Sequence, residues 1–238
     1  MEVLECIKAR RSIRKYLDKP IPWDLVAHII DAGRRAPSSG NLQNWKFILA
    51  LDADKRKAIA EASLKQYWME QAPLHIIIVA EPEKVKRYYG ERGERLYSVQ
   101  NCSIVATQMM LEATNLGLGS CWVGAFDEDM VKRALGMPKE ARPQIILTIG
   151  YAGEVPPESP RFPLEPITYF NKWRGRIRDV PSYFYYFTPK IQRGIKSTGA
   201  VAEKVGKSVM QKATDVAKSI RKKLEDKRKA QEARLREK

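Results

Sequence analysis

The chain has 238 residues, of which 44% are hydrophobic and 30% are charged, and it carries a formal net charge of +15. This length and apolar content are sufficient for one good-sized core. The N-terminus lacks the apolar stretch of a secretory signal and no run of about 18 apolar residues occurs, so we expect neither a signal peptide nor a membrane-spanning helix.

The cysteines and histidines argue against disulfides and metals. Cys6, Cys102 and Cys121 are odd in number and widely spaced, which fits a reducing compartment and gives no disulfide framework. His28 and His75 have no Cys or His partner at the spacing of metal ligands, so we expect no metal site. Together these features predict a cytoplasmic protein.

Hydrophobic periodicity predicts alternating helices and strands up to about residue 152. We expect helices at residues 2–9, 22–33, 54–63, 94–116 and 127–136, and strands at residues 46–51, 74–80, 120–126 and 144–152. Pro22 suits a first helical residue, Gly117 a helix stop and Asp127 an N-cap. This order predicts an α+β fold in three layers, with a mixed sheet covered by helices.

A dinucleotide-binding fold is not expected. Gly117 and Gly119 lie between a helix and a strand, whereas the G-x-G-x-x-G fingerprint joins a strand to a helix. The chain also has no Gly-Lys-Ser/Thr phosphate-binding loop.

A strongly basic segment follows the first expected helix, with the sequence Arg10-Arg11-Ser12-Ile13-Arg14-Lys15. Arginines make bidentate, permanently charged contacts with phosphate, and a serine hydroxyl donates one more hydrogen bond. The alternative is a solvated basic face or a non-specific patch for polyanions.

A polar loop follows about twenty residues later, with the sequence Pro37-Ser38-Ser39-Gly40-Asn41-Leu42-Gln43-Asn44-Trp45. Its neutral donors and acceptors suit the edge of a heterocycle better than a phosphate. Taken alone it also reads as an ordinary turn. Together with the basic segment, it suggests a phosphorylated heterocyclic cofactor.

Four motifs in order, within residues 1–175, make the chain similar to the FMN-dependent nitroreductase family of NAD(P)H-dependent flavin oxidoreductases. They are Arg10, Ser12 and Arg14; then Pro37, Ser38, Asn41, Gln43 and Trp45; then residues 117–126; then Ile149-Gly150-Tyr151 followed by Arg161. One departure is Gln43-Asn44-Trp45, where many members have Gln-Pro-Trp. This difference bears on the rigidity of the loop.

The resemblance implies a three-layer nitroreductase-like fold, with a mixed, mainly antiparallel sheet flanked by helices. It also implies an intertwined homodimer with FMN in each of two interface clefts. The implied activity takes hydride from NADH or NADPH and reduces nitroaromatic, quinone or related acceptors by a ping-pong mechanism at flavin N5. Because the flavin carries this chemistry, no catalytic protein residue is expected.

The resemblance also implies roles for individual residues. Arg10 and Ser12, with the neighbouring Arg11, would bind the ribityl phosphate, Arg161 would close that site, and Arg14 would lie near N1 and O2 of the pyrimidine. Pro37, Ser38, Ser39 and Asn41 would approach the flavin from the partner subunit. A strand of Trp122, Val123, Gly124 and Ala125 would run beneath the ring, with Gly124 allowing a main-chain N–H to meet N5. An ordinary buried strand is the simpler interpretation of that stretch.

Residues 181–238 form a separate tail beyond an expected FMN-binding domain at residues 1–180. The tail has 16 Lys and Arg against six Asp and Glu, and so carries +10 of the net +15. Apolar residues recur every three or four positions from Val201 to Leu224, which predicts a basic amphipathic helix. Residues 191–238 could bind an anionic membrane surface, pack on a helix or, less favourably, bind nucleic acid; a solvated, partly disordered tail is the alternative.

Two other functions stay open at this point. The chain could be a specialised flavin enzyme of the same fold, of the reductive dehalogenase or flavin-fragmenting type. It could instead be a flavin-binding tethering protein docked through its basic tail.

Overall fold

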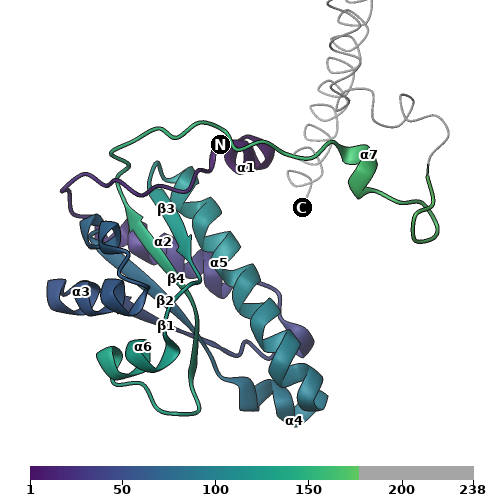
Figure 1. The fold of residues 1–238 in the computed structure, drawn as a ribbon, viewed down its shortest axis with the longest axis horizontal. Coiled ribbons are helices and arrows are strands. Elements are labelled where there is room, and N and C mark those ends of the chain that lie inside the picture. Colours follow the sequence, from purple (N-terminus) through teal and green to yellow (C-terminus); the bar gives the residue numbers. More distant parts are fainter. Residues whose placement is uncertain (177–238) are drawn as a thin grey trace, which may run out of the picture. The chain divides into compact units, whose positions relative to one another are not determined.

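A four-stranded sheet in the order β1-β2-β4-β3 organises the first part of the chain (Figure 1). The strands are β1 (Trp45–Ala50), β2 (Leu74–Ala80), β3 (Gly119–Val123) and β4 (Arg142–Gly150). All three strand pairs of the described residues are antiparallel, which agrees with the mainly antiparallel part of the prediction; none of them is the parallel pair that a mixed sheet requires. The connections through α3 (Ala53–Ala62) and α6 (Glu128–Leu135) each join antiparallel neighbours, β1 to β2 and β3 to β4, whereas β4 lies between β2 and β3.

The computed structural model describes residues 1–176, and the chain divides into two units, Met1–Glu158 and Ser159–Lys238. The described part of the second unit contains a short helix, α7 (Leu164–Ile167). It also has an edge-to-face contact between Tyr169 and Trp173, with ring centroids 5.0 Å apart. The predicted basic helix and the predicted boundary at residue 180 lie outside the described residues.

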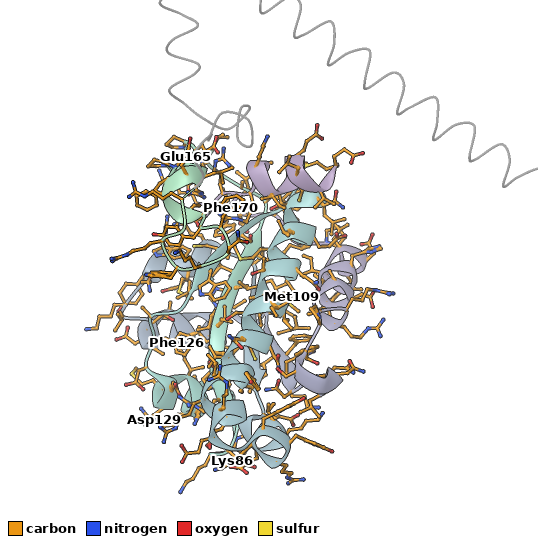
Figure 2. All side chains as sticks on the ribbon, turned by 90° about the vertical axis from the view of Figure 1, so that its right-hand side faces the viewer. Lys86, Met109, Phe126, Asp129, Glu165 and Phe170 are labelled. Carbon is orange, nitrogen blue, oxygen red and sulfur yellow. The ribbon has the colours of Figure 1, made fainter. Side chains whose placement is uncertain are left out.

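Two helices cover one face of the sheet. They are α2 (Trp23–Arg34) and α5 (Ser98–Asn115), which pack against each other and enclose Leu74, Ile76 and Ile78 of β2. Met109 of α5, labelled in Figure 2, is fully buried in this layer. It passes so close to Gly33 of α2 that a Cβ at that position would collide with it, which explains why this helical position is a glycine.

Two other helices cover the opposite face. They are α3 (Ala53–Ala62) and α6 (Glu128–Leu135), which pack over Ile77 and Val79 of β2 and Ile146 of β4. Since β2 is buried on both faces, its sequence is a continuous apolar run rather than an alternating one. The predicted three-layer α+β architecture is confirmed (Figure 1).

Several predicted boundaries are confirmed by their caps. Gly117, with a φ of 76°, terminates α5, and the N–H of Leu118 donates to the carbonyl of Ala113 at 2.8 Å. The Asp127 carboxylate accepts the N–H of Met130 at the start of α6. Pro22, however, is the N-cap of α2 rather than its first residue.

The structure also contains helical elements that periodicity missed. These are α4 (Pro82–Arg92) and two 3-10 turns, η1 (Ser39–Asn41) and η2 (Tyr67–Gln71). The helix predicted at residues 94–116 divides into the π-helical η3 (Gly93–Tyr97) and α5. In α4 only Pro82 and Val85 are buried, so its sequence carries little apolar signal. The first helix, α1 (Val3–Ala9), lies where it was predicted. Within the described part of the chain, no helix combines the length and apolarity needed to cross a membrane.

Candidate functional site

The basic segment lies beside the start of β3 and the end of β4. The Ile13 N–H donates to the Ser120 carbonyl at 3.0 Å, and the Leu17 N–H donates to the Tyr151 carbonyl at 2.9 Å. A parallel bridge also joins Ser12 to Ser120. The structure therefore brings together the first, third and fourth sequence motifs.

Two arginines of this segment carry uncompensated charge. Within residues 1–176, the guanidinium groups of Arg10 and Arg14 have neither a hydrogen-bond acceptor nor a salt-bridge partner, although Cζ of Arg14 lies 5.9 Å from the ring centroid of Trp68. The backbone below them is fixed, because Oε1 of Glu154 accepts the N–H groups of Arg14 at 2.6 Å and Lys15 at 3.1 Å. A rigid segment with two free guanidiniums fits an anionic ligand.

Cys121 identifies the centre of this cluster. Burial raises the pKa of its thiol, whereas the charge of Arg14, a hydrogen bond with Ser12 and the charge of Arg10 all lower it. The first motif therefore lies beside this part of β3, where Ser12 forms its bridge to Ser120. Beside it, Oγ of Ser120 is buried without a hydrogen-bond partner among the described atoms, which leaves an available polar group.

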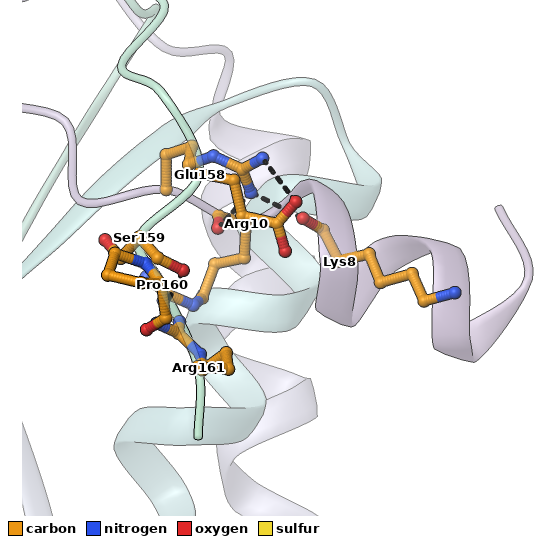
Figure 3. Close-up of polar contacts among 7 residues, drawn as sticks. Lys8, Arg10, Glu158, Ser159, Pro160 and Arg161 are labelled. Carbon is orange, nitrogen blue, oxygen red and sulfur yellow. Dashed lines mark hydrogen bonds and ion pairs between the residues drawn. The ribbon is translucent and has the colours of Figure 1, made fainter. Parts of the chain in front are cut away.

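Arg11 is engaged differently. Its Nη1 donates to the carbonyls of Lys8 at 2.5 Å and Arg10 at 3.0 Å, and Nη2 lies 4.0 Å from Oε2 of Glu158 (Figure 3). The Lys8 carbonyl belongs to the C-terminal turn of α1, where carbonyls lack helical partners. Arg11 thus caps α1, and its predicted part in binding a cofactor stays a prediction.

Arg161 belongs to the second unit. Its Nη1 donates to the carbonyls of Ser159 at 3.1 Å and Pro160 at 3.2 Å (Figure 3). Its side chain is exposed. The predicted closure of a phosphate site by Arg161 therefore stays a prediction.

The strand expected beneath a flavin ring is shorter than predicted. β3 ends at Val123, so Gly124 and Ala125 follow the strand rather than belong to it. The pairing with β4 stops at Val123 and Ile146, and the chain then turns towards the cap of α6. Val123 is buried between the sheet and α6, whereas Trp122 is 37% exposed on this edge strand. Gly124 is exposed, which leaves its backbone accessible.

The polar loop of residues 37–44, hereafter the serine loop, lies at the other end of the sheet. It precedes Trp45, which pairs with Ala80 at the end of β2, whereas the basic segment lies near Leu74 and Gly119 at the opposite end. Seven residues of strand separate these ends, which corresponds to about 20 Å. One chain therefore keeps the two expected halves of the cofactor site apart.

The serine loop borders a cavity of about 440 Å³ at the start of α5. Pro37, Ser38 and Ser39 line one side, and Asn101 and Ile104 belong to the other. Such a volume falls in the range of ligand pockets. Nearby, Gly40, Asn41 and Gln43 adopt left-handed backbone, with φ of 56°, 57° and 48°. For non-glycine residues this conformation costs about 1–3 kcal/mol each, and such strain clusters at functional sites.

Sequence reasoning missed two residues that organise these regions, Glu154 and Asn101. Glu154 had no signal beyond its place after the Ile-Gly-Tyr motif. Asn101 lies in a helix that periodicity explained entirely by its apolar face. The sequence signal that could have found Asn101 is its partner Asn44, which stands where the family resemblance predicts a proline.

Comparisons with known proteins identify similar sequences and similar folds. The sequence model described as Nitroreductase family matches residues 7–68 and 62–151. A protein of Methanothermobacter thermautotrophicus, provisionally named NADH dehydrogenase/NAD(P)H nitroreductase, is 33% identical over 179 residues, covering 73% of this chain and 88% of the relative. The FMN reductase [NAD(P)H] of Bacillus subtilis is 28% identical, covering 72% of this chain and 76% of the relative. The crystal structure of the NADPH:FMN oxidoreductase from Vibrio harveyi, complexed with NAD+, has a TM-score of 0.67 at 25% identity, covering 83% of this chain and 91% of that one.

Proposed function

Because the chain belongs to the nitroreductase family, we propose that it binds FMN and uses NADH or NADPH to reduce nitroaromatic, quinone or related acceptors. The names of the Bacillus and Vibrio relatives support both the flavin and the nicotinamide donor. The observation that carries the proposal is the pair of guanidiniums, Arg10 and Arg14, which have no hydrogen-bond or salt-bridge partner among residues 1–176 and flank Ser12, itself bridged to β3.

The residues of the basic segment fit the flavin mononucleotide. Arg10 and the Ser12 hydroxyl would bind the phosphate. Arg14 would lie at the pyrimidine end of the ring, where its charge stabilises a reduced, anionic flavin. Glu154 holds the backbone of Arg14 through two hydrogen bonds, so this charge is presented from a rigid position.

The protein's part in the reaction is orientation and electrostatics. FMN, when bound, supplies hydride acceptance from the nicotinamide and donation to the acceptor, with the two substrates taking turns in a ping-pong cycle. Gly124 has no side chain to prevent backbone from approaching the ring. Trp122 is exposed on the edge strand of the sheet and would contact the ring. No described side chain needs to act as nucleophile or general base.

We infer that each flavin site is shared between two chains of a homodimer. The basic segment and the serine loop lie at opposite ends of β2, too far apart to contact one FMN within a single chain. Pro37, Ser38, Ser39 and Asn41 would therefore reach the flavin bound to the partner. Val99 and Ile104 on the exposed face of α5 are apolar, which suits an interface beside that loop.

The test is optical and simple. The purified full-length protein should be yellow, should lose this colour on anaerobic addition of NADH or NADPH, and should regain it when a quinone or nitroaromatic is added. A colourless protein that takes up no added FMN would refute the proposal. A bound flavin that stays oxidised with both donors would instead favour the alternative function, a flavin-binding tethering protein.

Replacing Arg10 tests the site itself. Arg10→Ala should yield a folded protein with lower flavin content, because a hydrogen bond to a charged group contributes about 1.5–3 kcal/mol. Arg133→Ala is the matched control, since Arg133 is an exposed arginine on α6. Equal flavin content in the two variants would remove Arg10 from the site.

We infer a separate role for the basic tail. Residues 191–238 lie in the segment that carries +10 of the net charge, and each Lys or Arg near an anionic membrane contributes about 1 kcal/mol. This composition supports peripheral membrane binding in the cytoplasm, beside a catalytic domain formed by residues 1–180. Nucleic acid is the less favoured polyanion.

A further inference from the structure

We propose that a buried pair of amides, Asn44 and Asn101, is a positioning device that holds the serine loop in its flavin-binding conformation. The proposal rests on the proposed function, in which this loop completes the partner's site. It assigns a role to two residues that do not themselves contact the cofactor.

The pair is fully buried and fully hydrogen-bonded. Asn44 has no exposed surface and Asn101 is 2% exposed. Nδ2 of Asn101 donates to Oδ1 of Asn44 at 2.7 Å, and Nδ2 of Asn44 donates to Oγ of Ser98 at 3.1 Å. Oδ1 of Asn101 accepts the N–H of Ser39 at 3.1 Å and lies 3.3 Å from its Oγ. The amides therefore connect the loop to the first turn of α5 in one continuous series.

These bonds hold both ends of a strained segment. Ser39 lies before the left-handed residues Gly40, Asn41 and Gln43, and Asn44 lies directly after them. Backbone of this kind persists only where its surroundings fix it. The carbonyl of Asn44 is fixed as well, because it accepts the N–H of Glu81 at 2.8 Å. The same pair of side chains thus anchors the loop on either side of its unfavourable turn.

Gly40 shows how closely the turn is enclosed. A Cβ at this position would lie 2.6 Å from the hydroxyl oxygen of Tyr89 in α4, so the loop has no room to relax towards that helix. The loop also bonds to itself, since the Gln43 N–H donates to Oγ of Ser38 at 3.0 Å. Ser38 and Ser39 are therefore presented at defined positions beside the cavity at the start of α5.

Asn44 is the position at which the sequence departs from the Gln-Pro-Trp that the family resemblance leads us to expect. A proline at this position would push Gln43 towards extended backbone, whereas Gln43 has a φ of 48° here. It would also lack the side-chain amide that reaches Ser98 and Asn101. We infer that this chain replaces the covalent stiffness of proline with a buried hydrogen-bond network, which is effective only when every member is satisfied.

The test compares flavin affinity with fold stability in the full-length protein. Asn44→Ala, Asn101→Ala and the double variant would be stripped of flavin and titrated with FMN, following flavin fluorescence. Asn115→Ala, at the exposed end of α5, is the matched asparagine control. Ile59→Ala, in the opposite layer, controls for a loss of stability without a change at the loop.

Each single variant should weaken FMN binding about tenfold, the effect of losing one or two buried hydrogen bonds. The double variant should bind no more weakly than the single ones, because the pair acts as a unit. Asn115→Ala and Ile59→Ala should keep the wild-type dissociation constant, although Ile59→Ala melts at a lower temperature. Amide hydrogen exchange of residues 38–44 should accelerate in flavin-free Asn101→Ala, while that of β2 should stay slow.

Two outcomes would overturn the inference while leaving the proposed function intact. One is a wild-type protein that binds FMN and an Asn101→Ala variant that binds it equally well. The other is additive losses in the double variant. Failure of the wild-type protein to bind FMN would instead refute the proposed function. If Asn101→Ala does not fold, Ser98→Ala takes its place in the test, because it removes only the hydrogen bond from Asn44 to Ser98. This variant should bind FMN about threefold more weakly than the wild-type protein. Unchanged binding would count against the inference.

Discussion

The hydroxyl of Tyr16 lies 2.7 Å from Oγ1 of Thr148, inside the sheet end that carries the basic segment. It also donates to the carbonyl of Ile13 at 2.7 Å. Burial raises the pKa of this hydroxyl, against a smaller lowering by Thr148, so it stays a neutral donor. Tyr16 thereby fixes residues 13–16 to β4 and orients the arginines that precede it.

Tyr16→Phe should therefore affect both stability and flavin binding. Losing a buried hydroxyl with two partners should lower the free energy of unfolding by about 1–3 kcal/mol, as measured by urea denaturation. Flavin content should fall at the same time, because the basic segment loses its anchor. Tyr88→Phe is the control, since Tyr88 is 71% exposed. Wild-type stability in Tyr16→Phe would show that these hydrogen bonds contribute nothing net.

Mixed dimers should reveal whether the site is shared. We expect Arg14→Ala and Asn41→Ala homodimers each to lose flavin from both sites. Since Arg14 and Asn41 lie at opposite ends of the sheet, a heterodimer of the two should have one site lacking both groups and one intact site. Differently tagged chains, co-purified and assayed for flavin per dimer, provide the measurement. A heterodimer as depleted as the parent homodimers would contradict sharing, as would a flavin-loaded monomer in light scattering.

Stability should depend on pH through His75. This imidazole is fully buried in β2, where burial lowers its pKa to about 4, against a smaller rise from its hydrogen bond with the Met69 carbonyl. The unfolded chain binds this proton below about pH 6.5, so stability should fall as the pH drops from about 6.5 to about 4, by up to about 3 kcal/mol. Urea midpoints across this window should show the slope.

The dependence of stability on pH should become weaker when the His75 imidazole is removed. His75→Gln should have a shallower dependence on pH between about 4 and 6.5 than the wild-type protein. His28→Gln should keep the wild-type slope, because His28 is exposed on α2. If both variants retain it, other buried groups are responsible.

Removal of the tail should leave flavin chemistry intact. A chain ending at Val180 should be reduced by NAD(P)H at the wild-type rate, since the tail carries charge rather than any of the sequence motifs. The full-length protein should sediment with anionic vesicles in a salt-sensitive manner, and the shortened chain should not. Equal sedimentation of both chains, or of neither, would defeat the membrane proposal. Binding to DNA but not to vesicles would move the assignment to nucleic acid.

Much of the fold could be predicted because its signals are local. The apolar run of β2, the Gly117 stop and the Asp127 cap each act within a few residues, and the structure confirms them. The direction of strand pairing is not local: the sheet was expected to be mixed and mainly antiparallel, and all strand pairs of the described residues are antiparallel. Similarly, α4 buries so little apolar surface that hydrophobic periodicity could not predict it.

The site was only half predictable for a related reason. The charges of residues 10–14 could be recognised from their sequence, but not that Arg11 turns back to α1 while Arg10 and Arg14 stay unpaired. The substitution of asparagine at position 44 could be seen, but its partners come from a helix more than fifty residues away. Side-chain networks of this kind depend on the assembled fold.

The edge of β3 has a consequence for handling the protein. β4 pairs with one side of this strand, and on the other side, among residues 1–176, the basic segment covers only its beginning, through Ser12 and Ile13. Uncovered strand edges template pairing with other chains and so promote aggregation. A ligand bound between the basic segment and β3 would shield this edge, so preparations kept saturated with flavin should stay dispersed where stripped ones precipitate.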